Sequence, residues 1–263
     1  GIVVVPKGEF LTGPITLKSN VNLHLEEGSV IKFSTRQELY FPAVLTRWEG
    51  LDCYATRPMI YAYGETNVAI TGSGIIDGQG SNEHWWPWNG NPKFGWKEGG
   101  YSQRGGSRDR LQAYSEAGVP VAQRVFGLSD GLRPQLINLY SCNSVLIEGV
   151  KLLNSPFWVI HPLLCKNLIV RKVHIESMGP NGDGCDPESC YNVLIEDCYF
   201  DTGDDCIAIK SGRNLDGRKW SIPSENIVVR NCYMKNGHGG VVIGSEISGG
   251  FKNLFVENCK MDS

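Results

Sequence analysis

The chain has 263 residues, of which 41% are hydrophobic and 20% are charged, and its formal net charge is −3 at pH 7. This composition is typical of a folded globular protein and excludes a disordered chain. No run of about 18 apolar residues is present, so we expect no membrane span. The weakly acidic balance argues against nucleic acid as a partner, and it means that an acidic ligand must be held by local cations.

In chain order, the first predicted elements are short strands at residues 2–5, 15–17 and 21–25, separated by Gly and Pro turns. Residues 33–51 mix charged and aromatic side chains without a regular period and predict a loop. Strand patterns return at residues 59–63 and 68–76. The beginning of the chain therefore indicates an all-β protein.

The strand pattern disappears between residues 78 and 134, where one short helix is predicted at residues 107–116. An irregular insertion of this length is usually functional or disordered. It contains a cluster of tryptophans, namely Trp85, Trp86, Trp88 and Trp96. These flat apolar rings could form the wall of a carbohydrate cleft, or they could form a small secondary core.

A repeat runs through the rest of the chain. Each copy begins with an Asn that is followed by apolar residues one, three, six and eight positions later. The clearest copies start at Asn167, Asn192, Asn226 and Asn253, and looser ones at Asn67 and Asn143. A fixed pattern with a period of about 25 residues, combined with alternation inside each run, predicts one solenoid domain of stacked strands, a parallel β-helix. The Asn side chains could hydrogen-bond between coils at a corner.

Nine cysteines are present, an odd number without the Cys-x-x-Cys spacing of a zinc site. Cys198, Cys232 and Cys259 occupy the same position in successive repeats. We therefore expect a stacked column of buried thiols instead of a disulfide framework. The redox compartment is not determined by this pattern.

Four titratable residues lie in short glycine-rich turns between strand patterns: Asp183, Asp204, Asp205 and His238. Stacked coils place corresponding turns roughly 5 Å apart, so these side chains should share one patch. Glycoside hydrolases use a pair of carboxyl groups to protonate the leaving oxygen and to activate water. An Asp-Asp pair alone is a weak signal, because acids in such turns usually only cap the turn.

Two kinds of ligand are consistent with this patch. Calcium could bind oxygen atoms of Asp183, Asp186, Asp204 and Asp205. An anionic sugar could be held by the cations that follow the Asp pair, namely Lys210, Arg213, Arg218 and Lys219, of which the last two could equally belong to a solvated loop. We favour the sugar, because His and Lys are poor neighbours for a hard cation, and we predict no metal and no cofactor.

These residues resemble the polygalacturonase family, glycoside hydrolase family 28. The motifs Asn181-Gly-Asp183, Gly203-Asp-Asp205 and Gly237-His-Gly239 are similar in order and spacing to that family's Asn-Thr-Asp, Asp-Asp and Gly-His-Gly signatures. The resemblance covers nearly the whole chain. It implies a right-handed parallel β-helix that hydrolyses α-1,4-galacturonosyl bonds of pectin with inversion. Residues 82–88 and 210–218 resemble bacterial exo-acting members, which implies that the insertion closes one end of the cleft.

The resemblance also implies roles for individual residues. Asp204 would be the general acid, Asp183 and Asp205 would activate water, and His238 would support protonation of the acid. The expected substrate-binding residues are Asn181, Lys210 and Arg213. Inversion requires the acid and base carboxyls to be roughly 6.5 to 9.5 Å apart.

Two features depart from the family pattern. Gly182 stands where Thr is usual, which we expect to be a mild change. The family's Arg-x-Lys motif should follow His238 by about one coil, but the sequence ends first. Because the first residues resemble the middle of a coil and no polar cap follows the last strand pattern, we expect truncation at both ends. The alternatives are a rhamnogalacturonan hydrolase or other galacturonidase of the same family, and an inactive β-helix that binds pectic sugar. A secreted or periplasmic location is expected, without a signal peptide in this sequence, and the oligomeric state is left open.

Overall fold

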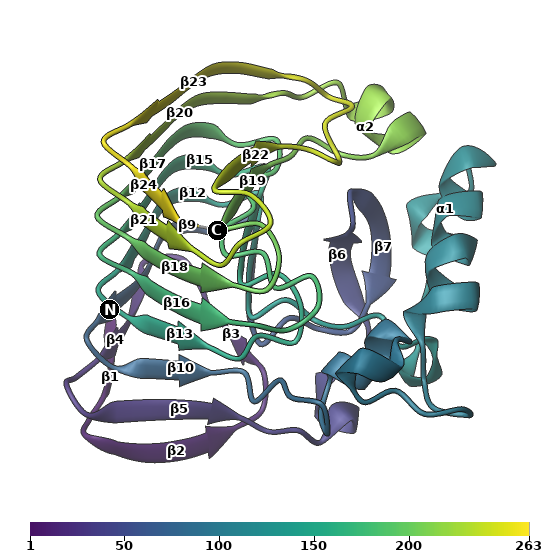
Figure 1. The fold of residues 1–263 in the computed structure, drawn as a ribbon, viewed down its shortest axis with the longest axis horizontal. Helices are drawn as coiled ribbons and strands as arrows, with labels where there is room; N and C mark the ends of the chain where they lie inside the picture. Colours follow the sequence, from purple (N-terminus) through teal and green to yellow (C-terminus); the bar gives the residue numbers. More distant parts are fainter. Residues whose placement is uncertain (263) are drawn as a thin grey trace.

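Parallel strands make up most of the regular structure, which is a computed structural model describing residues 1–262. Figure 1 shows them stacked as successive coils, from the purple first coil to the yellow last one. The first sheet contains β1 (Ile2–Val5), β4 (Val21–Leu25), β9 (Thr66–Gly72), β12 (Asn143–Glu148), β15 (Lys166–Arg171), β17 (Tyr191–Glu196), β20 (Ser224–Arg230) and β23 (Phe251–Glu257). The second contains β2 (Gly8–Thr12), β5 (Ser29–Phe33), β10 (Ile75–Asp77), β13 (Lys151–Leu153), β16 (His174–Ser177), β18 (Tyr199–Thr202), β21 (Tyr233–Lys235) and β24 (Lys260–Asp262).

A third, shorter face carries the strands that will matter for the site. Its strands are β3 (Ile15–Thr16), β8 (Ile60–Tyr63), β11 (Ile137–Tyr140), β14 (Ile160–Leu163), β19 (Ile207–Ile209) and β22 (Val241–Ile243). Single bridges from Cys185 to Ile160 and to Ile207 join the β14 side of this face to the β19 side. The parallel β-helix that the repeat predicted is confirmed.

The register between coils stacks equivalent positions of the repeat. Val193 of β17 pairs with Ile227 of β20, and both side chains are buried. Because successive side chains point to opposite faces of a strand, one set from every coil fills the interior. Each coil therefore buries its apolar face only by contact with its neighbours.

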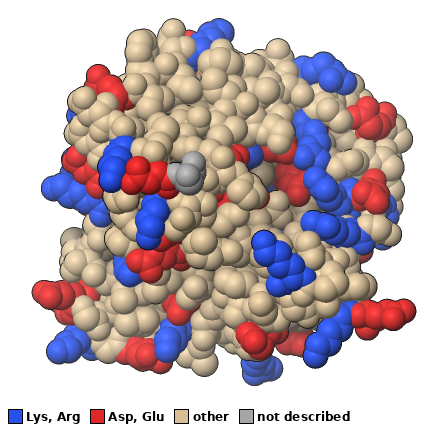
Figure 2. All heavy atoms as spheres, viewed as in Figure 1, with Lys and Arg blue, Asp and Glu red and all other residues tan. Residues whose placement is uncertain are grey.

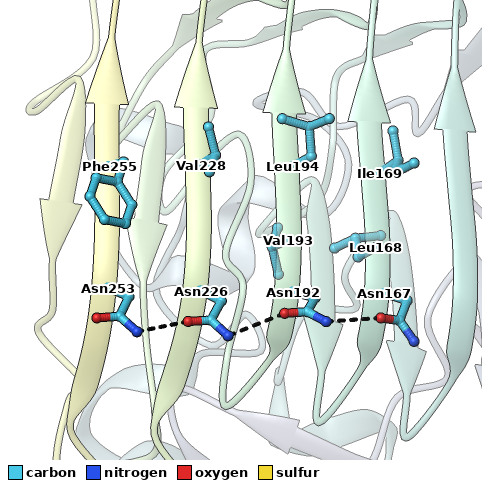
Figure 3. Close-up of a pocket in the computed structure, with 10 residues that line it drawn as sticks. All are labelled: Asn167, Leu168, Ile169, Asn192, Val193, Leu194, Asn226, Val228, Asn253 and Phe255. Atoms are coloured by element: carbon cyan, nitrogen blue, oxygen red, sulfur yellow. Dashed lines mark hydrogen bonds between the residues drawn. The ribbon is translucent and has the colours of Figure 1, made fainter.

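The predicted asparagine ladder runs along the outside of the helix (Figure 3). Asn253 donates to Asn226, Asn226 to Asn192 and Asn192 to Asn167, with nitrogen–oxygen distances of 2.8, 3.3 and 3.2 Å. All four have φ between 52° and 58°, a region that Asn tolerates better than most residues. The Asn thus permits the turn of the backbone and also links adjacent coils.

The cysteine column is also present, since all nine cysteines are free thiols and Cys198 and Cys232 are buried, with Cys259 half-buried at the end. A second column, formed by Cys142, Cys165 and Cys190, was not predicted. Both columns behave as small hydrophobic side chains of the interior.

The prediction of a loop over residues 33–51 is wrong. β6 (Val44–Trp48) and β7 (Leu51–Ala55) form an antiparallel hairpin, and Arg47 pairs with Asp52 at 2.9 Å inside the protein. The hairpin is buried on both faces under the insertion. Its strands therefore lack the alternation of apolar and polar residues by which a half-exposed strand is recognised. The predicted strand at residues 68–76 is also two strands, β9 and β10.

The predicted helix at residues 107–116 is confirmed as α1 (Arg108–Glu116), and α2 (Asn214–Trp220) follows β19. Single helical turns lie at Gln37–Tyr40, Trp86–Asn89, Pro92–Phe94, Val121–Gln123 and Leu128–Asp130, and an irregular turn at Gln103–Ser107 precedes α1. Among residues 1–262, no helix has the length and apolar character needed to cross a membrane.

The tryptophans of the insertion were predicted to form either a cleft wall or a small secondary core, and the structure shows both buried and cavity-lining positions. Trp85 and Trp88 are buried and join the main hydrophobic core. Trp86 is half-buried and donates its indole N–H to the carbonyl of Ser155 at 2.9 Å. Trp96 lines a separate surface cavity beside Trp88. The cluster is therefore mainly a core that attaches the insertion to the coils.

Candidate active site

Three carboxyl groups converge where the chain enters the third face of the helix. Asp183, Asp204 and Asp205 each place an oxygen within 4.8 Å of the others. The register explains this, because Cys185 bridges to Ile207 and therefore sets Asp183 level with Asp205 on the next coil. The convergence predicted from the glycine-rich turns is present.

His238 comes from one coil further along. Its backbone N–H donates to the carbonyl of Asp204 at 3.1 Å, and its Nδ1 lies 3.1 Å from Asp204 Oδ1. The His238 side chain is 73% exposed and that of Asp204 is 25% exposed. The same Asp204 oxygen accepts the backbone N–H of Asp205. Asp204 thus lies at the outer edge of the acid cluster, where its side chain reaches solvent.

Close backbone contacts explain two glycines of these turns. A Cβ on Gly203 would lie 2.5 Å from the carbonyl oxygen of Met178, and one on Gly182 would lie 2.7 Å from that of Ser177. A Thr at position 182 therefore requires the turn to shift. Gly182 is a local packing requirement of this chain, which is a stronger constraint than the mild change expected.

Lys210 lies beneath the acids. Its side chain is 4% exposed, and its Nζ lies 2.9 Å from Glu246, 3.7 Å from Asp183 and 4.0 Å from Asp186. It also donates to the carbonyl of Gly244 and lies 4.5 Å from the centre of the Trp158 ring. Lys210 and Arg213, which also contacts Glu246, therefore supply two cations for three buried carboxyl groups.

Burial and repulsion between neighbouring charges give these carboxyl groups different pKa values. Burial raises the pKa of Asp183 and of Asp186, and Lys210 opposes the shift. Burial followed by the nearby Asp204 raises the pKa of Asp205. Glu246 is also buried, but Lys210 and Arg213 overcome this and lower its pKa to about 2.

Of Asp183 and Asp186, Asp186 holds its proton more tightly. Asp186 is fully buried, and neither of its side-chain oxygens has a hydrogen-bond partner among the described residues. An ionised carboxylate in that position would be very costly, whereas Asp183 lies closer to the ammonium of Lys210 and lines the cavity. Asp183 therefore loses its proton before Asp186 as the pH rises.

The cavity over the acids is small, about 120 Å³, and almost entirely polar. It is lined by Glu49, Arg108, Trp158, Asn181, Asp183, Asp204, Asp205, Lys210, Arg213, Ser245 and Glu246. The predicted substrate-binding residues Asn181, Lys210 and Arg213 all line it. Arg218 and Lys219 are exposed on α2 and do not.

Two wall residues, Glu49 and Arg108, were not predicted because they come from segments outside the repeat. Glu49 is in the turn of the β6–β7 hairpin, and Arg108 begins α1 and pairs with it at 2.7 Å. Arg213 reaches the same Glu49 at 3.4 Å. Trp158 carried no signal. Figure 2 shows several Lys and Arg side chains gathered on this insertion side of the molecule, over the hairpin and α1.

The cluster could in principle hold a cation, since three carboxylate oxygens face one another. Asp186, which the calcium hypothesis included, lies outside that group. Lys210 already places a positive charge 3.7 Å from Asp183. The two arginines at the rim then add further positive charge, which suits an anionic ligand better than a metal ion.

Neighbouring coils bring together carboxyl groups, which are the groups that glycoside hydrolases use for catalysis. The comparisons with known proteins agree with this chemistry. The family model "Glycosyl hydrolases family 28" matches residues 128–263. The chain belongs to this family.

Individual relatives are named as polygalacturonases or galacturonosidases. The solved structure of a hyperthermoactive exopolygalacturonase from Thermotoga maritima has a TM-score of 0.96 and 52% identity, covering 98% of this chain and 58% of that one. A probable polygalacturonase of Vitis vinifera is 31% identical over 97% of this chain and 46% of its own length. The exo-poly-alpha-D-galacturonosidase of Dickeya chrysanthemi is 27% identical over 97% of this chain and 44% of its own. The chain spans about half the length of these curated relatives.

Replacing Asp186 with Asn should stabilise the protein increasingly as the pH rises. The pKa of Asp186 is raised in the folded state, so its stabilising effect is complete at low pH and is lost as the pH increases above the ordinary value of about 3.8. The variant avoids this loss, by up to about 1.4 kcal/mol per pH unit. Urea unfolding at pH 5 and pH 7.5 measures the difference, with the exposed Asp109→Asn as the matched control. A difference between Asp186→Asn and the native chain that is the same at both pH values would contradict the assignment.

Proposed function

We propose that this chain cleaves α-1,4-galacturonosyl bonds of pectin, and that it acts from the chain end. The observation that carries the proposal is the cluster of Asp183, Asp204 and Asp205, with oxygens within 4.8 Å of one another in a polar cavity. The family supports glycoside hydrolysis, and the names of the relatives above support galacturonate polymers as the substrate. Because pectin is an extracellular polymer, we also propose that the protein acts outside the cytoplasm.

Each acid has a distinct place in the proposed reaction. Asp204, at the exposed edge beside His238, donates a proton to the leaving oxygen. Asp205 and Asp183 lie deeper and hold the attacking water, and their raised pKa values make them better bases than an ordinary carboxylate. Lys210 is buried against Glu246 and Gly244, so we assign it to keeping Asp183 ionised, in addition to any contact with the sugar.

The cavity walls support an anionic end unit as the ligand. Arg108 and Arg213 converge on Glu49 at one side of the cavity, where they could also meet the carboxylate of a galacturonate unit. Since Arg108 belongs to the insertion, this wall lies where the exo-acting resemblance predicted a closed end. A cavity of about 120 Å³ suits a terminal unit better than a long polymer segment.

We also propose inversion. One oxygen of each aspartate lies within 4.8 Å of one oxygen of each of the others, whereas the roughly 6.5 to 9.5 Å of an inverting acid and base is the separation of whole carboxyl groups. The proposal depends on the presence of a third carboxyl group. Asp183 and Asp205 can share one water molecule while Asp204 protonates the leaving group.

Incubation with polygalacturonate should release monogalacturonate from the first time point, as seen by chromatography of reducing products. Asp204→Asn should lose this activity by about 10²-fold to 10⁴-fold, because the substituted side chain cannot donate the proton. A ladder of oligomers would disprove exo action. Products with ultraviolet absorbance would indicate a lyase, and sugar binding without products would indicate a binding protein. Faster release of reducing products from rhamnogalacturonan than from polygalacturonate would identify rhamnogalacturonan as the preferred substrate.

The stereochemical outcome is measured by proton NMR of the newly released reducing end. Inversion of an α bond should give the β anomer first, with the α anomer appearing only by mutarotation. Initial release of the α anomer would establish retention and contradict the proposal.

A further inference from the structure

Arg133 is a fully buried arginine behind the acid cluster, and the described residues provide it with no carboxylate partner. Its Nη1 donates to the carbonyls of Pro156 and Pro180 at 2.9 and 2.6 Å. Its Nε and Nη2 both donate to Gln103 Oε1, and Nη2 also donates to Asn181 Oδ1 at 2.7 Å. All five N–H groups of the guanidinium therefore have acceptors.

These contacts determine which way the amide of Asn181 points. A guanidinium can only donate hydrogen bonds, so the atom of Asn181 that faces Arg133 must be its oxygen. Asn89 donates its own Nδ2 to the same oxygen at 3.3 Å. Since Asn181 lines the cavity, its amide nitrogen is the atom left for the ligand.

We propose that Arg133 is a positioning residue that fixes Asn181 as a hydrogen-bond donor to an oxygen atom of the sugar bound against the three aspartates. This inference rests on the proposed function. Without Arg133 only the longer contact from Asn89, at 3.3 Å, would favour this orientation, and the flipped amide would present an oxygen to an anionic sugar. The rejection of a mismatched polar group in a buried site is a strong source of selectivity.

The arrangement also gives the insertion a role in the site. Gln103, Asn89 and Arg133 all lie between residues 78 and 134, whereas Asn181 belongs to the repeat. Arg133 is held from the other side by the ring of Phe157, 5.0 Å from its central carbon. The insertion thus orients an amide on the coil beside the acids, without contributing that amide itself.

The decisive variant is Asn181→Asp, which keeps an oxygen for Arg133 and replaces the donor facing the cavity with an acceptor. It should lower kcat/KM on polygalacturonate at least 100-fold while the melting temperature stays within a few degrees of the native value. Full activity of Asn181→Asp would overturn the proposal.

A double-mutant cycle tests whether Arg133 acts through Asn181. Arg133→Lys, which has three donors without the planar fork, should lower kcat/KM at least tenfold in the native chain and less than threefold in an Asn181→Ala background. Equal effects in both backgrounds would mean that Arg133 only supports the fold. Arg124→Lys is the matched control, because Arg124 is another buried arginine of the insertion but binds Asp216 away from the cavity. It should lower the melting temperature and leave kcat/KM unchanged.

Binding separates this inference from the proposed function. If the native chain does not cleave polygalacturonate, titration calorimetry with trigalacturonate replaces kinetics, and Asn181→Asp should weaken binding at least tenfold. A native chain that binds but does not cut would disprove hydrolysis and support the amide assignment if the variant binds more weakly. A native chain that does neither would overturn both.

Discussion

The contact between Lys210 and the carboxyl groups around it is the interaction on which the site depends. Its ammonium lies within 4.0 Å of Asp183, Asp186 and Glu246 in the protein interior. Removing a charge from water costs several kcal/mol, and Lys210 together with Arg213, which contacts Glu246, supplies two cations for three carboxyl groups. Protonation therefore reduces the negative charge of the site. The pKa of Glu246 is lowered, that of Asp186 is raised the most, and that of Asp183 lies between the two. A group in that intermediate condition can accept a proton near neutral pH.

The solenoid makes such an arrangement possible because its coils repeat. A single glycine-rich turn could place only one or two acids, whereas the bridge register from Cys185 to Ile207 and on to Val241 stacks three turns. The asparagine ladder and the apolar interior fix that register on the other faces. Buried polar groups then link the irregular insertion to the regular part, above all Arg133 with its five hydrogen bonds.

Much of the fold could be predicted from the sequence because each coil of a solenoid repeats the same pattern of polar and apolar residues. The Asn residues and the apolar positions that follow them, as after Asn167 and Asn192, predicted the stacked coils. Acids in the turns of successive copies then predicted that these side chains converge. The β6–β7 hairpin could not be predicted, since it is buried on both faces and has no polar alternation. Arg133, Arg108 and Glu49 were missed for a related reason, because they reach the site from nonrepeating segments whose partners are distant in sequence.

The most direct measurement of the account is a carboxyl-carbon NMR titration of protein labelled with ¹³C at the aspartate side chains, assigned with Asp183→Asn and Asp186→Asn. In the native chain, at least one signal of this pair should still be protonated at pH 6, and Lys210→Met should move its titration to higher pH, because the opposing cation has been removed. Titration of both carboxyl groups below pH 5, with no change in Lys210→Met, would contradict the account.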